Sequence, residues 1–206
     1  MTESTRFVVL GTGGAFTHIV LKTLIRNKLL PLAYIQSGDR PQHEKTSFAD
    51  IPLEVNKPHS PISKLLEAAS IPSYYQSQLE LAERVKQQHA DFLLVACWPD
   101  LLPNRVLRSV AKAALNLHPS LLPKYRGADP VSAQLTANDF QFGVTLHLLN
   151  EQFDAGDIVL QAALPLILGQ DKSAIEASAA KQGALLFLDA LACYHSPGWN
   201  LNKQTA

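Results

Sequence analysis

Short apolar segments alternate along this chain with longer segments in which apolar residues recur at helical spacing. The short segments are almost uniformly apolar, which is typical of strands buried on both faces of a sheet and therefore indicates mostly parallel pairing. The predicted strands are RFVVLG (6–11), PLAYIQ (31–36), DFLLVAC (91–97), AALNLH (113–118), FGVTLHLL (142–149) and DIVLQAAL (157–164).

Two helices are predicted between these strands. Residues 77–88 open with Ser77 and Glu80 in the spacing of a capping box, in which each side chain caps a backbone N–H of the first helical turn. Residues 15–27 carry one apolar stripe at helical spacing, formed by Ile19, Val20, Leu24 and Ile25.

A last helix follows the final strand. Ser173 and Glu176 stand in capping-box spacing, and an apolar series follows at Leu185, Leu186, Leu188 and Leu191. The alternation of strands and helices predicts an α/β fold with a Rossmann-like, doubly wound, mostly parallel sheet flanked by helices.

Length and charge narrow the class of protein further. A chain of 206 residues suits one core, so we expect a single domain over 1–195 and a tail over 196–206. Lys+Arg and Asp+Glu number 18 each, which gives no general attraction for nucleic acid or an anionic membrane. Without a long apolar run or a secretion signal, we expect a cytoplasmic protein. The proline-broken segment 37–61 is expected to be a long loop beside a binding site.

The two cysteines, Cys97 and Cys193, stand far apart in sequence. Their number and spacing indicate neither a disulfide framework nor a zinc site, and we expect no metal. Cys97 ends an apolar run, so we expect it to be a small buried hydrophobe.

Candidate chemistry begins at the end of the strand 113–118. Asn116 and His118 are two residues apart, so their side chains leave the strand on the same face, just before Pro119. A lone histidine there is more often structural, but the amide beside it offers donors for a developing oxyanion, and the imidazole can donate or accept a proton. Neither group is a strong nucleophile, so we expect direct acyl transfer to a nucleophile that the substrate supplies.

Such a pair needs a carboxylate to set the charge of the imidazole. Asp154, on an Asp-Ala-Gly turn, is the first candidate, and its rival Asp157 starts the next strand and can cap that turn. His147 lies within a predicted strand, where it is either a paired structural histidine or a substrate contact.

The first glycine-containing turn, VVLGTGGAF, invites a nucleotide-binding interpretation. Gly11 and Gly13 fit the dinucleotide fingerprint, but Phe16 occupies the position where a third small residue is needed. We therefore expect either a turn that faces the substrate, with Gly13 and Gly14 in contact with it, or a purely structural turn. Asp39 gives weak support for ribose binding.

The blocks NLHPSLLPKYRGADP and FGVTLHLLNEQFDAGDIVLQ resemble, in order and spacing, the folate-dependent formyltransferases. That family includes the methionyl-tRNA, glycinamide ribonucleotide and sugar-nucleotide formyltransferases, and the resemblance runs to about Leu164. It implies catalysis by Asn116, His118 and Asp154, with 10-formyltetrahydrofolate as the formyl donor.

The resemblance also implies a folate site beside CWPDLLPNRVL and the Asp154 turn. The implied contacts are Trp98, Asp100, Leu101, Leu102, Leu107, Ser120, Leu121, Leu122, Pro123, Asn150 and Phe153. The leucines can equally be ordinary core residues. The chain departs from the family pattern at Pro99, Asp100, Asp129 and Asn138, and a proline there removes an N–H and fixes φ, which bears on folate binding.

The acceptor amine is the remaining question. The resemblance implies that relatives acting on tRNA carry a further C-terminal domain; we expect none here, and so we expect neither tRNA as the acceptor nor a membrane partner. The motifs GVTLH and LPKYRG look closer to the sugar-nucleotide enzymes, so a small phosphorylated or nucleotide-linked amine, with an amino sugar favoured, is expected against the glycine turn, Lys124, Arg126 and His147. A methionyl-tRNA formyltransferase-like enzyme, a non-catalytic folate-binding module and hydrolysis of the donor by water remain alternatives, and a homodimer stays open.

Overall fold

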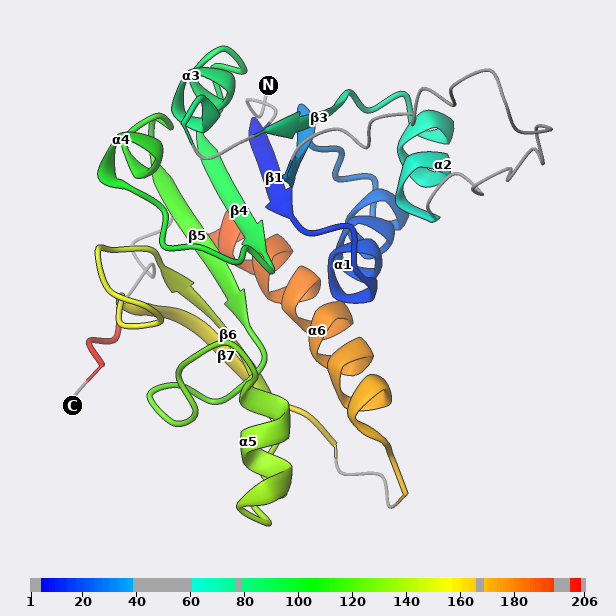
Figure 1. The fold of residues 1–206 in the computed structure, drawn as a ribbon, viewed down its shortest axis with the longest axis vertical. Coiled ribbons are helices and arrows are strands. Elements are labelled where there is room, and N and C mark those ends of the chain that lie inside the picture. The colour runs from blue at the N-terminus through cyan, green and yellow to red at the C-terminus, as the bar shows by residue number, and fades with distance from the viewer. Residues whose placement is uncertain (1–4, 39–60, 77–78, 166–168, 195–200, 205–206) are drawn as a thin grey trace, which may run out of the picture.

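A computed structural model describes residues 5–38, 61–76, 79–165, 169–194 and 201–204. Its seven strands form one sheet in the order β3-β2-β1-β4-β5-β6-β7 (Figure 1). The strands are β1 (Phe7–Gly11), β2 (Ala33–Ser37), β3 (Ser73–Gln76), β4 (Phe92–Ala96), β5 (Ala113–His118), β6 (Gly143–Leu148) and β7 (Ile158–Ala163). The helices are α1 (Ala15–Arg26), α2 (Pro61–Ala68), α3 (Leu81–Lys86), α4 (Asn104–Leu107), α5 (Pro130–Thr136) and α6 (Lys172–Cys193).

The sheet is parallel from β3 to β5, whereas β6 pairs antiparallel with both β5 and β7. Alternate residues of a strand point to opposite faces, and this period sorts the apolar side chains into two cores. Phe7 and Val9 of β1 pack with α1, α2 and α6, whereas Val8 and Leu10 pack with α3 and α4. The predicted doubly wound, mostly parallel sheet is confirmed.

The helix α1 also follows the prediction. Val20 and Leu24 of the predicted stripe are fully buried against the sheet, and Ile19 and Ile25 pack at the edge of the same core. Close packing here requires Gly11, because a Cβ on that residue would lie 2.5 Å from the methyl group of Thr17. The Thr17 hydroxyl donates a 2.7 Å hydrogen bond to the carbonyl of Ala96, which ties α1 to the end of β4.

Both predicted capping boxes are wrong. The N-cap of α6 is Asp171, whose carboxylate accepts a 2.8 Å hydrogen bond from Ala174 N, so Ser173 lies within the first turn. The N-cap of α3 is Glu80, without a side-chain capping bond, so this helix is shorter than predicted, and Ser77 lies outside the described residues. Aspartate is as good an N-cap residue as serine. The Ser173–Glu176 spacing alone therefore could not show that α6 is capped by Asp171.

Two other expectations meet the structure differently. Cys97 is exposed, with φ of 64°, because the chain turns out of the sheet directly after β4, so the prediction of a buried residue is wrong. Most of the predicted loop 37–61, with Asp39, lies outside the described residues, and Pro61 begins α2. The edge strand β3 and the short helices α2, α4 and α5 were not predicted, because their apolar patterns are too short to register.

Candidate active site

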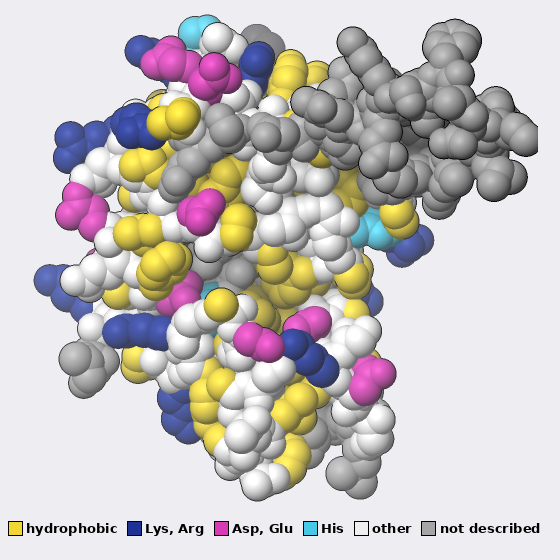
Figure 2. All heavy atoms as spheres, viewed as in Figure 1, with side chains coloured by type: hydrophobic (Ala, Val, Ile, Leu, Met, Phe, Trp, Pro, Cys, Tyr) yellow, Lys and Arg dark blue, Asp and Glu magenta, His cyan; other side chains and the backbone are white. Residues whose placement is uncertain are grey.

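A cleft of about 610 Å³ opens where the carboxyl ends of β1, β4 and β5 meet the turn before β7. This is the edge at which ligands bind in open α/β sheets, and the volume is in the range of small-molecule sites. Its lining combines apolar side chains with carboxylates, and Figure 2 shows hydrophobic and acidic groups together in the middle of this face. Asn116, His118 and Asp154 all belong to the lining.

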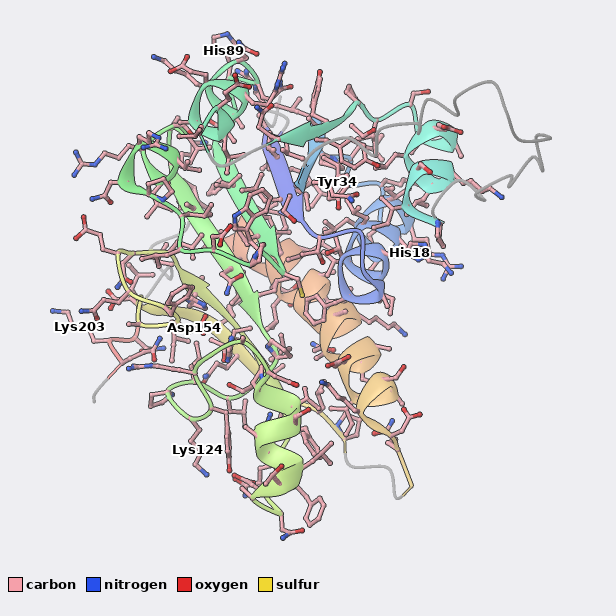
Figure 3. The ribbon with its side chains drawn as sticks, viewed as in Figure 1. His18, Tyr34, His89, Lys124, Asp154 and Lys203 are labelled. Atoms are coloured by element: carbon pink, nitrogen blue, oxygen red, sulfur yellow. The ribbon has the colours of Figure 1, made fainter. Side chains whose placement is uncertain are left out.

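The three predicted catalytic side chains meet in this cleft. The Nδ1 atom of His118 lies 3.3 Å from Asp154 Oδ1, and Asn116 Nδ2 donates to the same oxygen at 3.4 Å. Asn116 and His118 belong to β5, and Asp154, labelled in Figure 3, lies in the turn before β7. Asp157 is outside the described lining, so the structure favours Asp154 over its rival.

The ring of His118 is held between two oxygen acceptors. Its Nε2 atom lies 2.8 Å from the backbone carbonyl of Tyr125, which can only accept, so Nε2 carries a proton. Its Nδ1 atom faces the carboxylate of Asp154, which also needs a donor. This arrangement suits the doubly protonated imidazolium, and the ring is 3% exposed.

Asp154 is held as a carboxylate. Burial raises the pKa of this carboxyl, but the hydrogen bond from His118, the positive charge of that ring when it is protonated and the N–H of Gly127 together hold the pKa well below its usual range. The Gly127 N–H donates to Asp154 Oδ2 at 2.9 Å. The site therefore places an ionised carboxylate beside a histidine ring whose two nitrogens both face oxygen acceptors.

His147 lies behind the cleft and orients the asparagine. Its Nδ1 atom is 2.8 Å from the carbonyl of Leu148 and so donates, which leaves Nε2 as an acceptor for Asn116 Nδ2 at 3.1 Å. The ring is 1% exposed and outside the described lining. Of the two predicted roles for His147, the structure supports the paired structural one.

The predicted folate contacts divide into two groups. One group lines the cleft and consists of Trp98, Asp100, Leu101, Leu102 and Phe153. The other lies outside the described lining and consists of Leu107, Ser120, Leu121, Leu122, Pro123 and Asn150. Ser120 donates to the carbonyl of Lys124, and Leu122 N donates to Thr145 Oγ1, so these two residues shape the loop that carries Tyr125.

The predicted acceptor contacts divide in the same way. Gly14 lines the cleft, whereas Gly13 faces the side chain of Gln36. Lys124 pairs with Asp139 at 3.3 Å and projects away from Asp154 in Figure 3. Arg126 donates to Gln204 at 3.1 and 2.6 Å. Neither basic side chain lies in the described lining of the cleft.

Several lining residues were not predicted as contacts. They are Thr12, Ala15, Phe16, Val95, Cys97, Pro99, Leu117, Pro119, Gly127, Ala128, Asp129, Pro130, Leu149, Gln152 and Glu176. Glu176 comes from α6, far along the chain, and no local motif marks it. Others, such as Pro119 and Gly127, are sequence neighbours of predicted residues within the block NLHPSLLPKYRGADP, so the same motif could have predicted them.

Two of the departures from the family pattern have local explanations. Asp129 caps α5 by accepting a hydrogen bond from Ser132 N at 3.2 Å, and it pairs with Lys172 of α6 at 2.7 Å. Asn138 has φ of 52°, a conformation that asparagine tolerates better than most residues. Pro99 and Asp100 both line the cleft.

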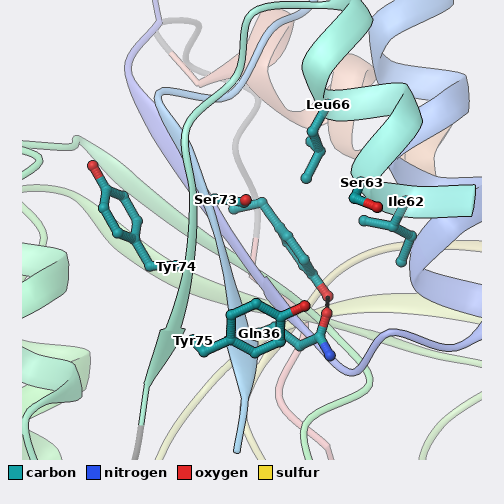
Figure 4. A pocket seen from close by; sticks show the side chains of 8 residues that line it. Gln36, Ile62, Ser63, Leu66, Ser73, Tyr74 and Tyr75 are labelled. Carbon is teal, nitrogen blue, oxygen red and sulfur yellow. Dashed lines mark hydrogen bonds between the residues drawn. The ribbon is translucent and has the colours of Figure 1, made fainter. Parts of the chain in front are cut away.

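A second hollow between β2, β3 and α2 is too small for a substrate. It measures about 10 Å³, the space of about one water, and Tyr34 lines it together with Gln36 and Tyr75, which Figure 4 labels. The hydroxyl of Tyr34 donates to Gln36 Oε1 at 3.5 Å, and burial raises the pKa of Tyr34 well above its usual value. The large cleft is therefore the candidate active site.

Among the described residues, no group of three or more His, Cys, Asp or Glu is arranged to hold a metal ion. Within the same residues, no helix combines the length and apolar character needed to cross a membrane.

Comparison with known proteins identifies the family. A formyl transferase family model matches residues 5–191 of the chain. The chain belongs to the formyl transferase family. Methionyl-tRNA formyltransferase of Lactobacillus delbrueckii is 30% identical over 187 residues, which cover 89% of this chain and 56% of that protein. The corresponding Helicobacter pylori (strain P12) enzyme is 29% identical over 196 residues, covering 93% of this chain and 61% of that protein. The chain thus spans little more than half the length of these relatives.

Solved structures agree on the fold. Glycinamide ribonucleotide transformylase 1 of Symbiobacterium toebii superimposes with a TM-score of 0.72 at 18% identity, covering 100% of this chain and 96% of that one. A 4-N formyltransferase of Francisella tularensis gives a TM-score of 0.68 at 18% identity, covering 98% and 74%. Similarity at this level of identity establishes the Rossmann-like formyltransferase fold and not the acceptor.

Proposed function

We propose that this chain transfers a formyl group from 10-formyltetrahydrofolate to the amine of a small acceptor. The observation that carries the proposal is the meeting of Asn116, His118 and Asp154 in the lining of one cleft, within a chain of the formyl transferase family. In this reaction the bond from the formyl carbon to N10 of the donor breaks, and a bond from that carbon to the acceptor nitrogen forms. The acceptor nitrogen loses one proton and N10 gains one.

The cleft fits a flat donor with a hydrogen-bonding edge. Apolar surface for the donor comes from Trp98, Leu101, Leu102 and Phe153. The side chain of Phe153 is 58% exposed, and an exposed aromatic ring in a cleft is typical of a ligand contact. The indole Nε1 of Trp98 is buried and has no hydrogen-bond partner among the described residues. When bound, the donor supplies an activated formyl carbon, and these residues would hold its ring system.

Asn116 is the proposed oxyanion donor. One of its Nδ2 hydrogens is engaged by His147 at 3.1 Å, while the other makes only a 3.4 Å contact with Asp154. The weaker contact is the one that can be exchanged for a formyl oxygen. A preorganised donor of this kind lowers a barrier by about 2.7–4 kcal/mol.

His118 and Asp154 are the proposed electrostatic and proton-handling pair. The imidazolium supplies positive charge beside the position where negative charge develops on the formyl oxygen. Asp154 keeps that imidazolium charged. The proton that the acceptor nitrogen loses passes to N10 of the donor, with water beside this pair as the relay.

The lining also bears on the acceptor. It contains Asp100, Asp129, Asp154 and Glu176, and no lysine or arginine among the described residues. This composition favours a ligand recognised by its amine, and gives no support to a phosphate-binding role for Lys124 and Arg126. We keep an amino sugar as the first candidate, on the resemblance of GVTLH and LPKYRG to the sugar-nucleotide enzymes.

Methionyl-tRNA is the second candidate acceptor. It is favoured by one specific observation, that relatives at 30% identity are methionyl-tRNA formyltransferases. Against it stand the zero net charge of the chain and the absence of basic groups from the described lining, since tRNA binding depends on neutralised phosphates.

The test is the amine-dependent loss of formyl from 10-formyltetrahydrofolate with amino sugars, glycinamide ribonucleotide and methionyl-tRNA as separate acceptors. Transfer to one of these amines supports the proposal, and the amine that is formylated is the acceptor. Loss of formyl at the same rate without any amine would make the chain a hydrolase. Tight donor binding, seen as a thermal shift worth about 2.7 kcal/mol at a hundred times Kd, with no turnover would make it a binding module.

A further inference from the structure

The segment 201–204 folds back onto the sheet beside the turn that carries the catalytic carboxylate. Asn202 N donates to the carbonyl of Ile158 at 2.9 Å, and Ile158 N donates to the carbonyl of Asn202 at 2.8 Å. This antiparallel bridge stands at the first residue of β7. It brings Gln204 against the Asp154 turn, whereas the side chain of Lys203, labelled in Figure 3, is exposed.

The side-chain amide of Gln204 uses its full hydrogen-bonding capacity at this turn. Its Nε2 group donates to the carbonyl of Asp154 at 2.9 Å and to the carbonyl of Gly156 at 2.7 Å. Its Oε1 atom accepts from Nε and Nη2 of Arg126, at 3.1 and 2.6 Å. An amide offers two donors and two acceptor lone pairs, so all four are engaged.

Together with the bond from Gly127 to Asp154, these hydrogen bonds link Gln204, Arg126 and Asp154 in a closed network. Gln204 holds Arg126, and the next residue, Gly127, donates its N–H to Asp154 Oδ2. Gln204 also holds the backbone carbonyl of Asp154 itself. The backbone and the side chain of Asp154 are therefore tied to the same partner from two directions.

The turn needs such support. Asp154 has φ of 50°, in the left-handed region that non-glycine residues adopt at a cost and keep only when surrounding contacts impose it. A Cβ on Gly156 would lie 1.8 Å from the carbonyl oxygen of Leu148, so the turn also packs closely against the end of β6. Gln204 adds hydrogen bonds to the carbonyls of Asp154 and Gly156.

We propose that Gln204 is a positioning residue, which holds the Asp154 carboxylate in register with His118. This inference rests on the proposed function for its catalytic consequence, but its structural part is independent of turnover. Gln204 lies outside the described lining of the cleft, so it acts through Asp154 and not on a ligand.

The test compares Gln204→Ala and Gln204→Glu with a control, Lys203→Ala. Lys203 is the neighbouring residue, and its side chain is exposed. Gln204→Glu keeps an acceptor for Arg126 but has no donor for the two carbonyls. The first readout is hydrogen exchange of the Gly127 amide by NMR, because that N–H reports the position of the carboxylate. Both variants are expected to speed its exchange by about tenfold or more, with the amide of Leu94 in β4 unchanged.

The second readout is steady-state turnover. A misplaced carboxylate should lower kcat by about tenfold or more and leave KM for the donor unchanged, whereas Lys203→Ala should alter neither. Unchanged Gly127 exchange in both variants would overturn the proposal. Equal acceleration at Gly127 and Leu94 would also overturn it, since that result describes a general loss of stability. If the wild-type chain transfers no formyl group but Gly127 responds, the positioning role stands and the proposed function fails.

Discussion

The Nδ1 atom of His118, at the end of β5, lies 3.3 Å from the Oδ1 atom of Asp154, in the turn before β7. Antiparallel β6 connects these elements and carries His147, which contacts Asn116 from behind. An imidazole ring, a carboxylate and an amide donor are thereby placed around one point in the cleft. The consequences of this arrangement can be measured one residue at a time.

Replacing Asn116 by alanine removes the proposed oxyanion donor. We expect kcat to fall by about a hundredfold to a thousandfold with little change in donor binding, because the lost bond matters most in the transition state. Steady-state kinetics and a donor thermal-shift titration measure the two effects. The matched control is Asn138→Gly, at an exposed position with positive φ that glycine accepts. A fall in donor affinity that accounts for the whole loss would assign Asn116 to binding instead.

The ionised state of Asp154 should make the fold sensitive to acid. Its pKa is well below the usual range in the folded chain, so its charge stabilises the fold above the unfolded pKa of about 3.9. That contribution is lost as the pH falls below this value toward the folded pKa.

We therefore expect wild-type protein to lose more free energy of unfolding between about pH 5 and about pH 3 than Asp154→Asn does. Urea unfolding at a series of pH values measures this. Asp139→Asn is the comparison, because Asp139 also has a lowered pKa, through hydrogen bonds from Gln141 and Tyr125, but it lies nearer the surface and is screened by solvent. Parallel pH profiles for wild type and Asp154→Asn would contradict the assignment.

Cys97 should be slow to react although it is accessible from the cleft. Although the residue is exposed at the cleft, the surrounding atoms partly desolvate its sulfur, and this desolvation, followed by the negative charge of Glu176, raises the pKa of the thiol to about 11. At pH 8 about one thiol in a thousand is then ionised, and only the thiolate is a nucleophile. Alkylation followed by mass spectrometry should show slow modification at pH 8, faster modification in Glu176→Gln, and protection by bound donor. Modification as fast as that of a free thiol would refute this account.

Much of the fold could be predicted because its signals are local. Uniform apolar runs identified β1, β2, β4, β5, β6 and β7, and the stripe at Ile19, Val20, Leu24 and Ile25 identified the buried side of α1. The direction of β6 could not be read in this way, because an apolar run is the same in either direction. The cap of α6 was misplaced because Asp171 and Ser173 are equally good caps by residue type, and the start of α3 was misplaced because its N-cap, Glu80, makes no side-chain capping bond.

The meeting of the three candidate side chains in one cleft was predictable from the spacing of Asn116 and His118, together with the turn that ends at Gly156. Its supporting contacts were not, since they join segments far apart in sequence, as Gln204 joins Asp154 to Arg126. Lys124 and Arg126 were predicted to bind the acceptor because they are basic and follow Asn116 and His118 closely in sequence. Their partners, Asp139 and Gln204, come from other segments, and no local pattern links them to these two residues.

The most direct test of the catalytic centre compares the two carboxylates near the same turn. Formyl transfer is measured at saturating donor and amine for Asp154→Asn and for Asp157→Asn, which changes a side chain outside the described lining of the cleft. The account predicts a loss in kcat on the order of a hundredfold or more for Asp154→Asn and wild-type turnover for Asp157→Asn. Equal activity of the two variants, or a loss confined to Asp157→Asn, would contradict it.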